Sequence, residues 1–215
     1  MRFVSLFFGL TLFALGIVLT LNAKIGYSPW EILHSGLSVL SGISIGMVSS
    51  IVGLAIGVII WIRGEKFGIG SILNMVGIGL IMDLFLALGF IPVAHTLPSS
   101  ILMLVAGLYT IALGSFFYIA AGFGAGPRDG LMLILTRVTH VPIGVVRSLI
   151  EFTAAFIGWL LGGMVGLGTV ISVLAGGFCV QTTFKLFRFE PDKVTHETLQ
   201  ETIAHLRYRK LQDRP

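Results

Sequence analysis

Ionisable residues inside apolar surroundings are the first candidates for chemistry. Glu31 and His34 are three positions apart, so on a helix they would share one face and could relay a proton or hold a metal ion. Arg147 and Glu151 are four positions apart, and Glu151 falls near the middle of an apolar stretch. A carboxylate in such surroundings is costly unless it is paired or hydrated. Two interpretations stay open: a structural Arg147–Glu151 pair, or a carboxylate that couples transport to an ion.

Other polar residues give weaker signals. Asp83 and Asn74 lie in another apolar stretch, where they could line a cavity or hydrogen-bond to neighbouring helices. No second set of His, Cys or Asp residues has the spacing of metal ligands, and no nucleophile lies near a base in the pattern of an enzyme. We therefore predict no metal, no cofactor and no catalytic activity. The single Cys179 is expected to be a small buried residue.

The composition defines what surrounds these residues. Of the 215 residues, 55% are hydrophobic and only 11% are charged. A soluble domain has about a quarter of its residues charged, so something other than water must cover this chain. Lipid offers no hydrogen bonds, so apolar runs of about 20 residues must cross it as helices. We therefore predict an all-α, polytopic membrane protein whose partner is the lipid bilayer. The net charge of +4 is too thinly spread for nucleic-acid binding.

Apolar segments follow one another in the order long, short, long, long, and this order occurs twice. The two short ones carry charges and are too short to cross a bilayer. The predicted spans are Val4–Leu21, Ser44–Ile62, Ile69–Leu88, Ile101–Ala120, Pro142–Leu161 and Leu167–Phe187, and the short segments are Pro29–Leu40 and Pro127–His140.

The two halves of the chain repeat one another without a gap. Val4–Gly89 aligns with Leu102–Phe187, which places Pro29 over Pro127. Each half has three predicted spans, an odd number, so the second half must enter the membrane from the opposite side and the repeat is inverted. We therefore expect a first transmembrane repeat at 1–98, a second at 99–188 and a cytoplasmic tail at 189–215.

Basic residues indicate the orientation. The predicted outer loops, Phe90–Ser99 and Gly162–Gly166, contain no Lys or Arg, and Lys24 is the one exception on that side. Cytoplasmic loops are enriched in such residues, so we expect both termini in the cytoplasm. The residues then placed inside are Arg2, Arg63, Lys66, Arg128, Arg137, Lys185 and Arg188.

Each half interrupts its helical pattern after the first span. Ser28 is placed to cap a new helix, Pro29 suits its first position, and Glu31 would complete a capping box. Paired breaks in inverted halves are typical of a transporter's binding site, although elbows that only pack the bundle give the same pattern. The candidate substrate-binding residues are Ser28, Trp30, Glu31, His34, Arg128 and Asp129, and the candidate coupling or intramembrane polar residues are Arg147, Glu151, Asp83 and Asn74.

The stretch Gly16–His34, which reads GIVLTLNAKIGYSPWEILH, resembles the signature of the YczE-like bacterial membrane proteins, related to the YitT group. Phe67–Ser71 is similar to the stretch that opens the third span in that family. The resemblance covers Arg2–Arg188 and implies a multi-pass protein of the bacterial cytoplasmic membrane, in a family without an assigned substrate. The second half departs from the signature at Pro127–Asp129, where Pro-Arg-Asp replaces Pro-Trp-Glu. A site at both breaks would therefore be asymmetric, and Arg128 beside a helix N-terminus would favour an anionic ligand.

Two functions fit these observations. The first is a small-solute transporter or channel with its site at the paired breaks. The alternative is a non-transporting scaffold that assists a partner complex, for which the polar tail would be the contact. A chain this short could pair with a second copy, as a homodimer, to enclose a path for a small-molecule or anionic substrate.

Overall fold

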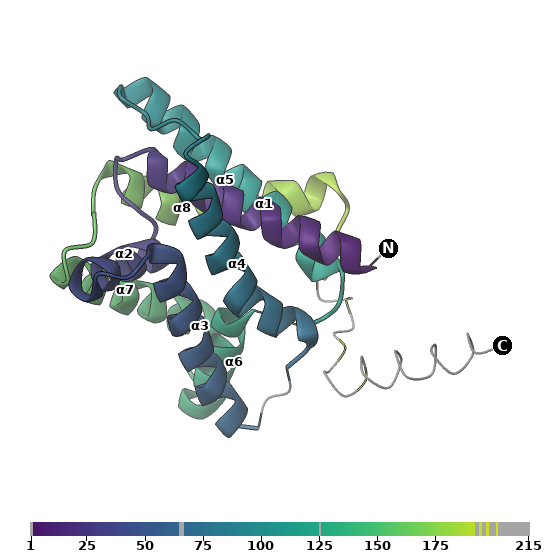
Figure 1. Cartoon of the computed structure of the whole chain (residues 1–215). Coiled ribbons are helices and arrows are strands. Elements are labelled where there is room, and N and C mark those ends of the chain that lie inside the picture. The colour runs from purple at the N-terminus through teal and green to yellow at the C-terminus, as the bar shows by residue number, and fades with distance from the viewer. Residues whose placement is uncertain are drawn as a thin grey trace.

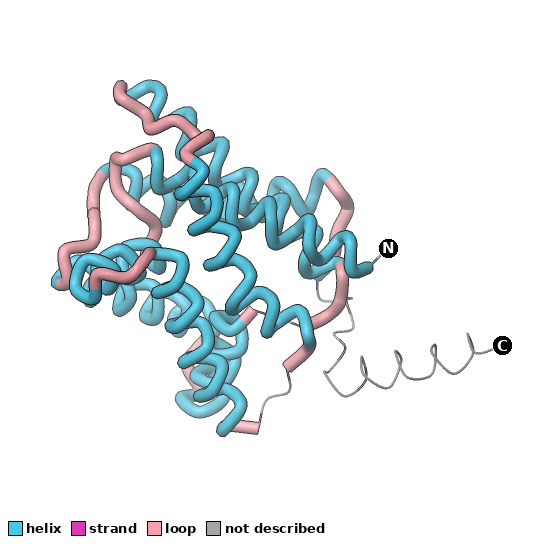
Figure 2. The backbone as a smooth tube through the Cα atoms, in the orientation of Figure 1, coloured by secondary structure: helices cyan, strands magenta, loops and turns pink. Residues whose placement is uncertain are grey.

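The computed structural model describes residues 2–64, 67–124, 126–191, 194, 197 and 201 of the chain. These residues form helices and contain no strand, and short loops join the helices (Figures 1 and 2). The helices are α1 (Arg2–Asn22), α2 (Pro29–Ser41), α3 (Ile45–Ile62), α4 (Ile69–Leu88), α5 (Leu97–Ala120), α6 (Pro127–Thr139), α7 (Ile143–Leu160) and α8 (Leu167–Leu186).

Six of these helices, namely α1, α3, α4, α5, α7 and α8, are long and apolar enough to cross a membrane. They match the six predicted spans, and α2 and α6 match the two short segments. The largest difference is at α5, which begins at Leu97 and not at Ile101. The reason is a capping box between Thr96 and Ser99, with a proline in the first turn, which starts the helix early. Lys66 and most of the tail lie outside the described residues.

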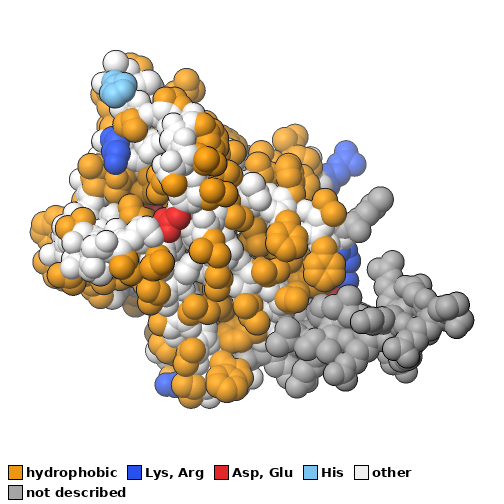
Figure 3. Space-filling view, in the orientation of Figure 1, with side chains coloured by type: hydrophobic (Ala, Val, Ile, Leu, Met, Phe, Trp, Pro, Cys, Tyr) orange, Lys and Arg blue, Asp and Glu red, His pale blue; other side chains and the backbone are white. Residues whose placement is uncertain are grey.

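The outer surface of the bundle is apolar. Large hydrophobic side chains such as Trp61, Leu174 and Leu186 are mostly exposed, and Figure 3 shows hydrophobic groups over much of the visible face. Water would disfavour such a surface, whereas lipid tails solvate it, so the side chains support the assignment of the long helices as membrane spans.

The most extensive helix–helix interface is that of the antiparallel pair α1 and α5, which lie side by side in Figure 1. Glycines bring the two backbones together: a Cβ atom on Gly9 would lie 2.9 Å from the Gly114 carbonyl oxygen, and one on Gly16 would lie 2.8 Å from that of Gly107. Small residues at a helix interface allow this approach in a bilayer, where dispersion contacts replace the hydrophobic effect.

Each short helix packs against a long helix of the other half. α2 lies on α7, and α6 lies on α3. The α2–α7 contact depends on Gly158, since a Cβ atom there would lie 2.4 Å from the backbone of both Ile32 and Leu33. α4 packs on α1 and α8 on α5. The breaks before α2 and α6 are therefore held between the halves.

Candidate functional site

The break that precedes each short helix is hydrogen-bonded to the first turn of a long helix in the other half. The Gly168 N–H, in the first turn of α8, donates to the Ile25 carbonyl at 2.6 Å, and the Gly70 N–H of α4 donates to the Phe123 carbonyl at 2.8 Å. The first N–H groups of a helix have no partner within the helix, so these bonds satisfy them. They also fix where each short helix begins.

Both breaks use a glycine in a left-handed backbone conformation. Gly26 has φ of +113° and Gly124 has φ of +115°. A Cβ atom on Gly26 would also lie 2.6 Å from the Gly166 nitrogen, and one on Gly124 would lie 2.9 Å from the Gly68 nitrogen. A side chain is therefore excluded by both the conformation and the space at these two positions.

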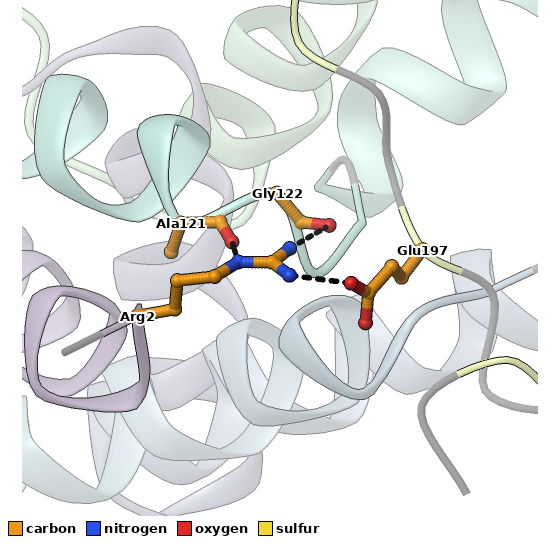
Figure 4. A network of polar contacts seen from close by, with 4 residues as sticks. All are labelled: Arg2, Ala121, Gly122 and Glu197. Carbon is orange, nitrogen blue, oxygen red and sulfur yellow. Dashed lines mark hydrogen bonds and ion pairs between the residues drawn. The ribbon is translucent and has the colours of Figure 1, made fainter. Parts of the chain in front are cut away.

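Arg2 ties the second break to the start of the chain, as Figure 4 shows. Its Nε donates to the Ala121 carbonyl at 2.9 Å and its Nη2 to that of Gly122 at 3.5 Å. Its Nη1 pairs with Glu197, and the guanidinium lies 4.7 Å from the centre of the Phe123 ring. The residue predicted to be an orienting charge thus also stabilises the loop before α6.

α2 begins where the sequence predicts, but its cap differs. Ser28 is the N-cap residue and Pro29 opens the helix, yet the Ser28 side chain makes no capping hydrogen bond. The predicted capping box with Glu31 is wrong. The physical reason is that the Glu31 carboxylate turns towards Arg128, so it does not reach back to the Ser28 N–H.

The starts of α2 and α6 meet in a polar cluster within an apolar shell. An Arg128 Nη2 atom lies 3.8 Å from Glu31 Oε1, and the guanidinium lies 4.5 Å from the centre of the Trp30 ring. The His34 ring lies 6.3 Å from that of Trp30. Glu31 and His34 are only 5% and 2% exposed. The structure thus brings together four of the six predicted binding residues, which come from opposite halves of the chain.

Burial shifts the pKa values of two groups in the cluster, Glu31 and His34. Burial raises the pKa of Glu31 above its ordinary 4.5; Arg128 lowers it and Glu151 raises it, and the net shift is upward. Burial, and then the charge of Arg128, lower the pKa of His34 from 6.5 to about 3. His34 is therefore a neutral imidazole at pH 7.

The buried imidazole of His34 has unused hydrogen-bonding capacity. Among the described residues it neither donates nor accepts a hydrogen bond, although a neutral imidazole carries one donor and one acceptor nitrogen. A ligand that enters the cluster could therefore form a hydrogen bond with a ring nitrogen of His34.

The remaining candidates lie around the cluster. Ser28 is half-buried at the start of α2. The Asp129 side chain falls outside the described part of the chain. The Arg147 Nε donates to Glu151 Oε1 at 3.0 Å along α7, so the predicted pair forms. Glu151 also lies near enough to Glu31 for its charge to act on that carboxylate.

Asp83 has a structural position. Its Oδ1 accepts the Gly46 N–H at 2.8 Å and its Oδ2 accepts the Ser44 hydroxyl, so it caps α3 from α4. Asn74 is half-buried on the same helix, and its side chain makes no hydrogen bond among the described residues. Its role as a cavity-lining residue stays a prediction.

One feature was missed by reasoning from the sequence. A half-open cavity of about 540 Å³ lies along α8, where Gln181 and Lys185 line it, and Arg147 is its one lining residue from α7. Lys185 is predicted only as an orienting charge at a helix end. Its place in a cavity depends on the packing of two helices, for which a single sequence gives no signal.

Comparisons with known proteins agree with the predicted resemblance. Residues 1–185 match the model of a family of unknown function (DUF6198). The chain is 36% identical over 184 residues to the uncharacterized membrane protein YczE of Bacillus subtilis (strain 168), covering 84% of each chain. It is 33% identical over 177 residues to an uncharacterized protein of Haemophilus influenzae, covering 82% of this chain and 80% of that one. No solved structure matches the chain. The protein is therefore an integral membrane protein that belongs to this YczE-like family.

Proposed function

We propose that this protein is a small-solute transporter or channel of the bacterial cytoplasmic membrane. Its site, in this proposal, is the cluster of Trp30, Glu31, His34 and Arg128, and its substrate carries an anionic group. The observation that carries the proposal is the buried His34, which makes no hydrogen bond among the described residues, beside an arginine where two helices begin. Helix N-termini and a guanidinium both favour anions.

The contacts between helices support an inverted repeat of residues 1–98 and 99–188. The pairs α1–α4 and α2–α7 have the counterparts α5–α8 and α6–α3. The hydrogen bonds from Gly168 to Ile25 and from Gly70 to Phe123 join aligned positions in the same way. In this proposal α2 and α6 are re-entrant helices and both termini are cytoplasmic. Discontinuous helices at the interface of inverted repeats are the usual site of secondary transporters.

The cluster suggests how a proton could take part. In the absence of substrate, Glu31 neutralises Arg128 across 3.8 Å. An anion that binds Arg128 must compete with this carboxylate, and protonation of Glu31 would remove the competitor. Because burial already raises the pKa of Glu31, protonation costs less there than at an exposed carboxylate. Proton uptake and anion binding would then favour each other, as in symport.

A thermal-stability screen tests the proposal. Purified protein in detergent is heated with organic acids, phosphate-bearing compounds, amino acids, sugars, nucleobases and inorganic ions. A ligand at about 100 times its dissociation constant stabilises the folded protein by about 2.7 kcal/mol. We expect an anionic compound to do so for the wild type but not for Arg128→Gln. Arg63→Gln, at an exposed arginine that ends α3, is the matched control and should respond as the wild type does.

The competing function is a scaffold for a partner complex. If no compound stabilises folded protein, and a partner co-purifies only when residues 189–215 are present, the transport proposal is wrong. If a compound still stabilises Arg128→Gln, the protein binds that compound, but at a site outside the cluster.

A further inference from the structure

The two aligned halves differ at one interface. α3 and α4 pack with their backbones almost in contact, since a Cβ atom on Gly46 would lie 2.1 Å from the Gly79 carbonyl oxygen. Asp83 stabilises this contact, because it accepts the Gly46 N–H at 2.8 Å and the Ser44 hydroxyl. A carboxylate acceptor makes these hydrogen bonds stronger than bonds between neutral groups.

The counterparts on α7 and α8 stand apart. Gly144 and Gly177 align with Gly46 and Gly79, yet a Cβ atom on either would meet no other atom within 4 Å. Over the described residues, α7 and α8 share no interface comparable to that of α3 and α4, whereas the other helix pairs of the first half have counterparts. Both glycine surfaces are therefore available for a contact that the first half already makes.

The space between α7 and α8 is the cavity of about 540 Å³, and its charged residues are both basic. Arg147 is neutralised by Glu151 at 3.0 Å, while Lys185 has no ion pair among the described residues. Aromatic side chains, Phe184 and Phe189, complete its wall. A cleft with net positive charge and apolar walls raises the local concentration of anions.

Helix α7 borders both the cavity and the cluster, because α7 carries Arg147 and packs on α2 at Gly158. Arg147 lines the cavity, and it binds Glu151 one turn further along α7. The carboxylate of Glu151 in turn acts on Glu31, next to Arg128.

We propose that the cavity between α7 and α8 is the vestibule through which an anionic solute reaches Arg128, and that it closes when Gly144 packs against Gly177. This inference rests on the proposed transport function. In the closed form Gln181, which aligns with Asp83, accepts the Gly144 N–H through its amide oxygen. A neutral amide is a weaker acceptor than a carboxylate, and Pro142 has no hydroxyl in the place of Ser44. The α7–α8 contact is therefore easier to open than the α3–α4 contact.

Distances between spin labels test the closure without any knowledge of the substrate. Labels at Val145→Cys and Phe178→Cys flank Gly144 and Gly177, in a Cys179→Ala background. Their aligned positions, Met47 and Leu80, stay half-exposed although α3 and α4 are packed, so the labels leave room for closure. We expect two distances for the α7–α8 pair in lipid vesicles, and the shorter one should equal the distance between labels at Met47→Cys and Leu80→Cys.

A blocking substitution provides the decisive comparison. Gly177→Leu fits the open form, because nothing lies within 4 Å, but it cannot enter a glycine–glycine contact. We expect it to fold and to lose the shorter distance. Gly176→Leu is the matched control, since that glycine is equally unobstructed and aligns with Ile78, which is buried in a cluster made largely of α1 residues and not in the Gly46–Gly79 contact. A single long distance that Gly177→Leu leaves unchanged overturns the closure.

Charged thiol reagents test the vestibule itself. In Gln181→Cys with Cys179→Ala, we expect the anionic methanethiosulfonate reagent to react about tenfold faster than the cationic one, relative to free cysteine. Lys185→Gln should abolish most of this preference. Equal rates for both reagents overturn the anionic vestibule. The anionic group that binds here could also be a lipid headgroup. In that case phosphatidylglycerol would occupy the vestibule, and the anionic reagent would react much more slowly with Gln181→Cys in phosphatidylglycerol vesicles than in phosphatidylcholine vesicles. That result would overturn a path for a solute.

These measurements separate the two proposals. If labels report closure but no compound stabilises the protein through Arg128, the transport function fails while the two conformations stand. If a compound binds through Arg128 but α7 and α8 never approach, the transport function stands and the gate is wrong.

Discussion

The pH dependence of stability gives the sharpest test of the burial of His34. The substitution is His34→Gln, which keeps a polar side chain but cannot take up a proton. The pKa of the folded-state imidazole is about 3, against 6.5 for an ordinary histidine. The folded protein therefore binds fewer protons than the unfolded chain between these values. Stability from this group is present above pH 6.5 and is lost as the pH falls towards 3.

The magnitude follows from these two values. Between pH 7 and pH 5 an unfolded histidine takes up most of a proton that His34 does not, which costs about 2 kcal/mol. Glu31 acts with the opposite sign, since its raised pKa makes the folded state relatively more stable as the pH falls. Both the wild type and His34→Gln contain Glu31, so a comparison of the two removes most of the contribution of Glu31 to the pH dependence.

The assay is the free energy of unfolding in mixed detergent micelles titrated with SDS at pH 7 and at pH 5. We expect the wild type to lose about 2 kcal/mol more than His34→Gln over this interval. His95→Gln, at an exposed histidine in a loop, should behave as the wild type does. Equal losses for His34→Gln and the wild type would refute the burial of a neutral imidazole.

Three further substitutions, the first with a matched control, test the helix packing, the cap of α3 and the loop before α6. Gly158→Ala should destabilise the protein by about 3 kcal/mol, because its Cβ atom would overlap the backbone of α2, whereas Gly144→Ala should change the free energy of unfolding by less than about 1 kcal/mol. Asp83→Asn should cost about 1–2 kcal/mol in the same titration, since it weakens the hydrogen bonds that cap α3; an unchanged value would contradict that role. Arg2→Gln should cost about 1 kcal/mol and speed the proteolysis of the loop before α6, and an unchanged cleavage rate would show that Arg2 does not hold it.

The helices could be predicted from the sequence because their causes are local. Apolar runs of the length of a bilayer, bounded by Gly, Pro and Ser, identify all six long helices. Pro29 and Pro127 mark where the short helices begin. Thr96 and Ser99 also form a local cap, and because of it α5 begins at Leu97 and not at the predicted Ile101.

Contacts between distant parts of the chain could be predicted only where the repeat indicated them. The alignment of the two breaks suggested that Arg128 and Glu31 belong to one site, and the structure places them together. The spacing from Ser28 also suggests a capping role for Glu31, but the attraction of the half-buried Arg128 guanidinium dominates over that local bond. The separation of α7 from α8 depends on how whole helices pack, and matched glycines in both halves cannot reveal it.

Quenching of Trp30 fluorescence by iodide tests the central claim most directly, because iodide is itself a small anion and the ring lies 4.5 Å from Arg128. Trp61→Phe and Trp159→Phe leave Trp30 as the single tryptophan, since the chain has three. We predict saturable quenching by iodide that becomes weak and linear in Arg128→Gln, while quenching by neutral acrylamide stays the same in both proteins. Iodide quenching that is linear from the outset, or that is unchanged by Arg128→Gln, would contradict an anion site where the two short helices meet.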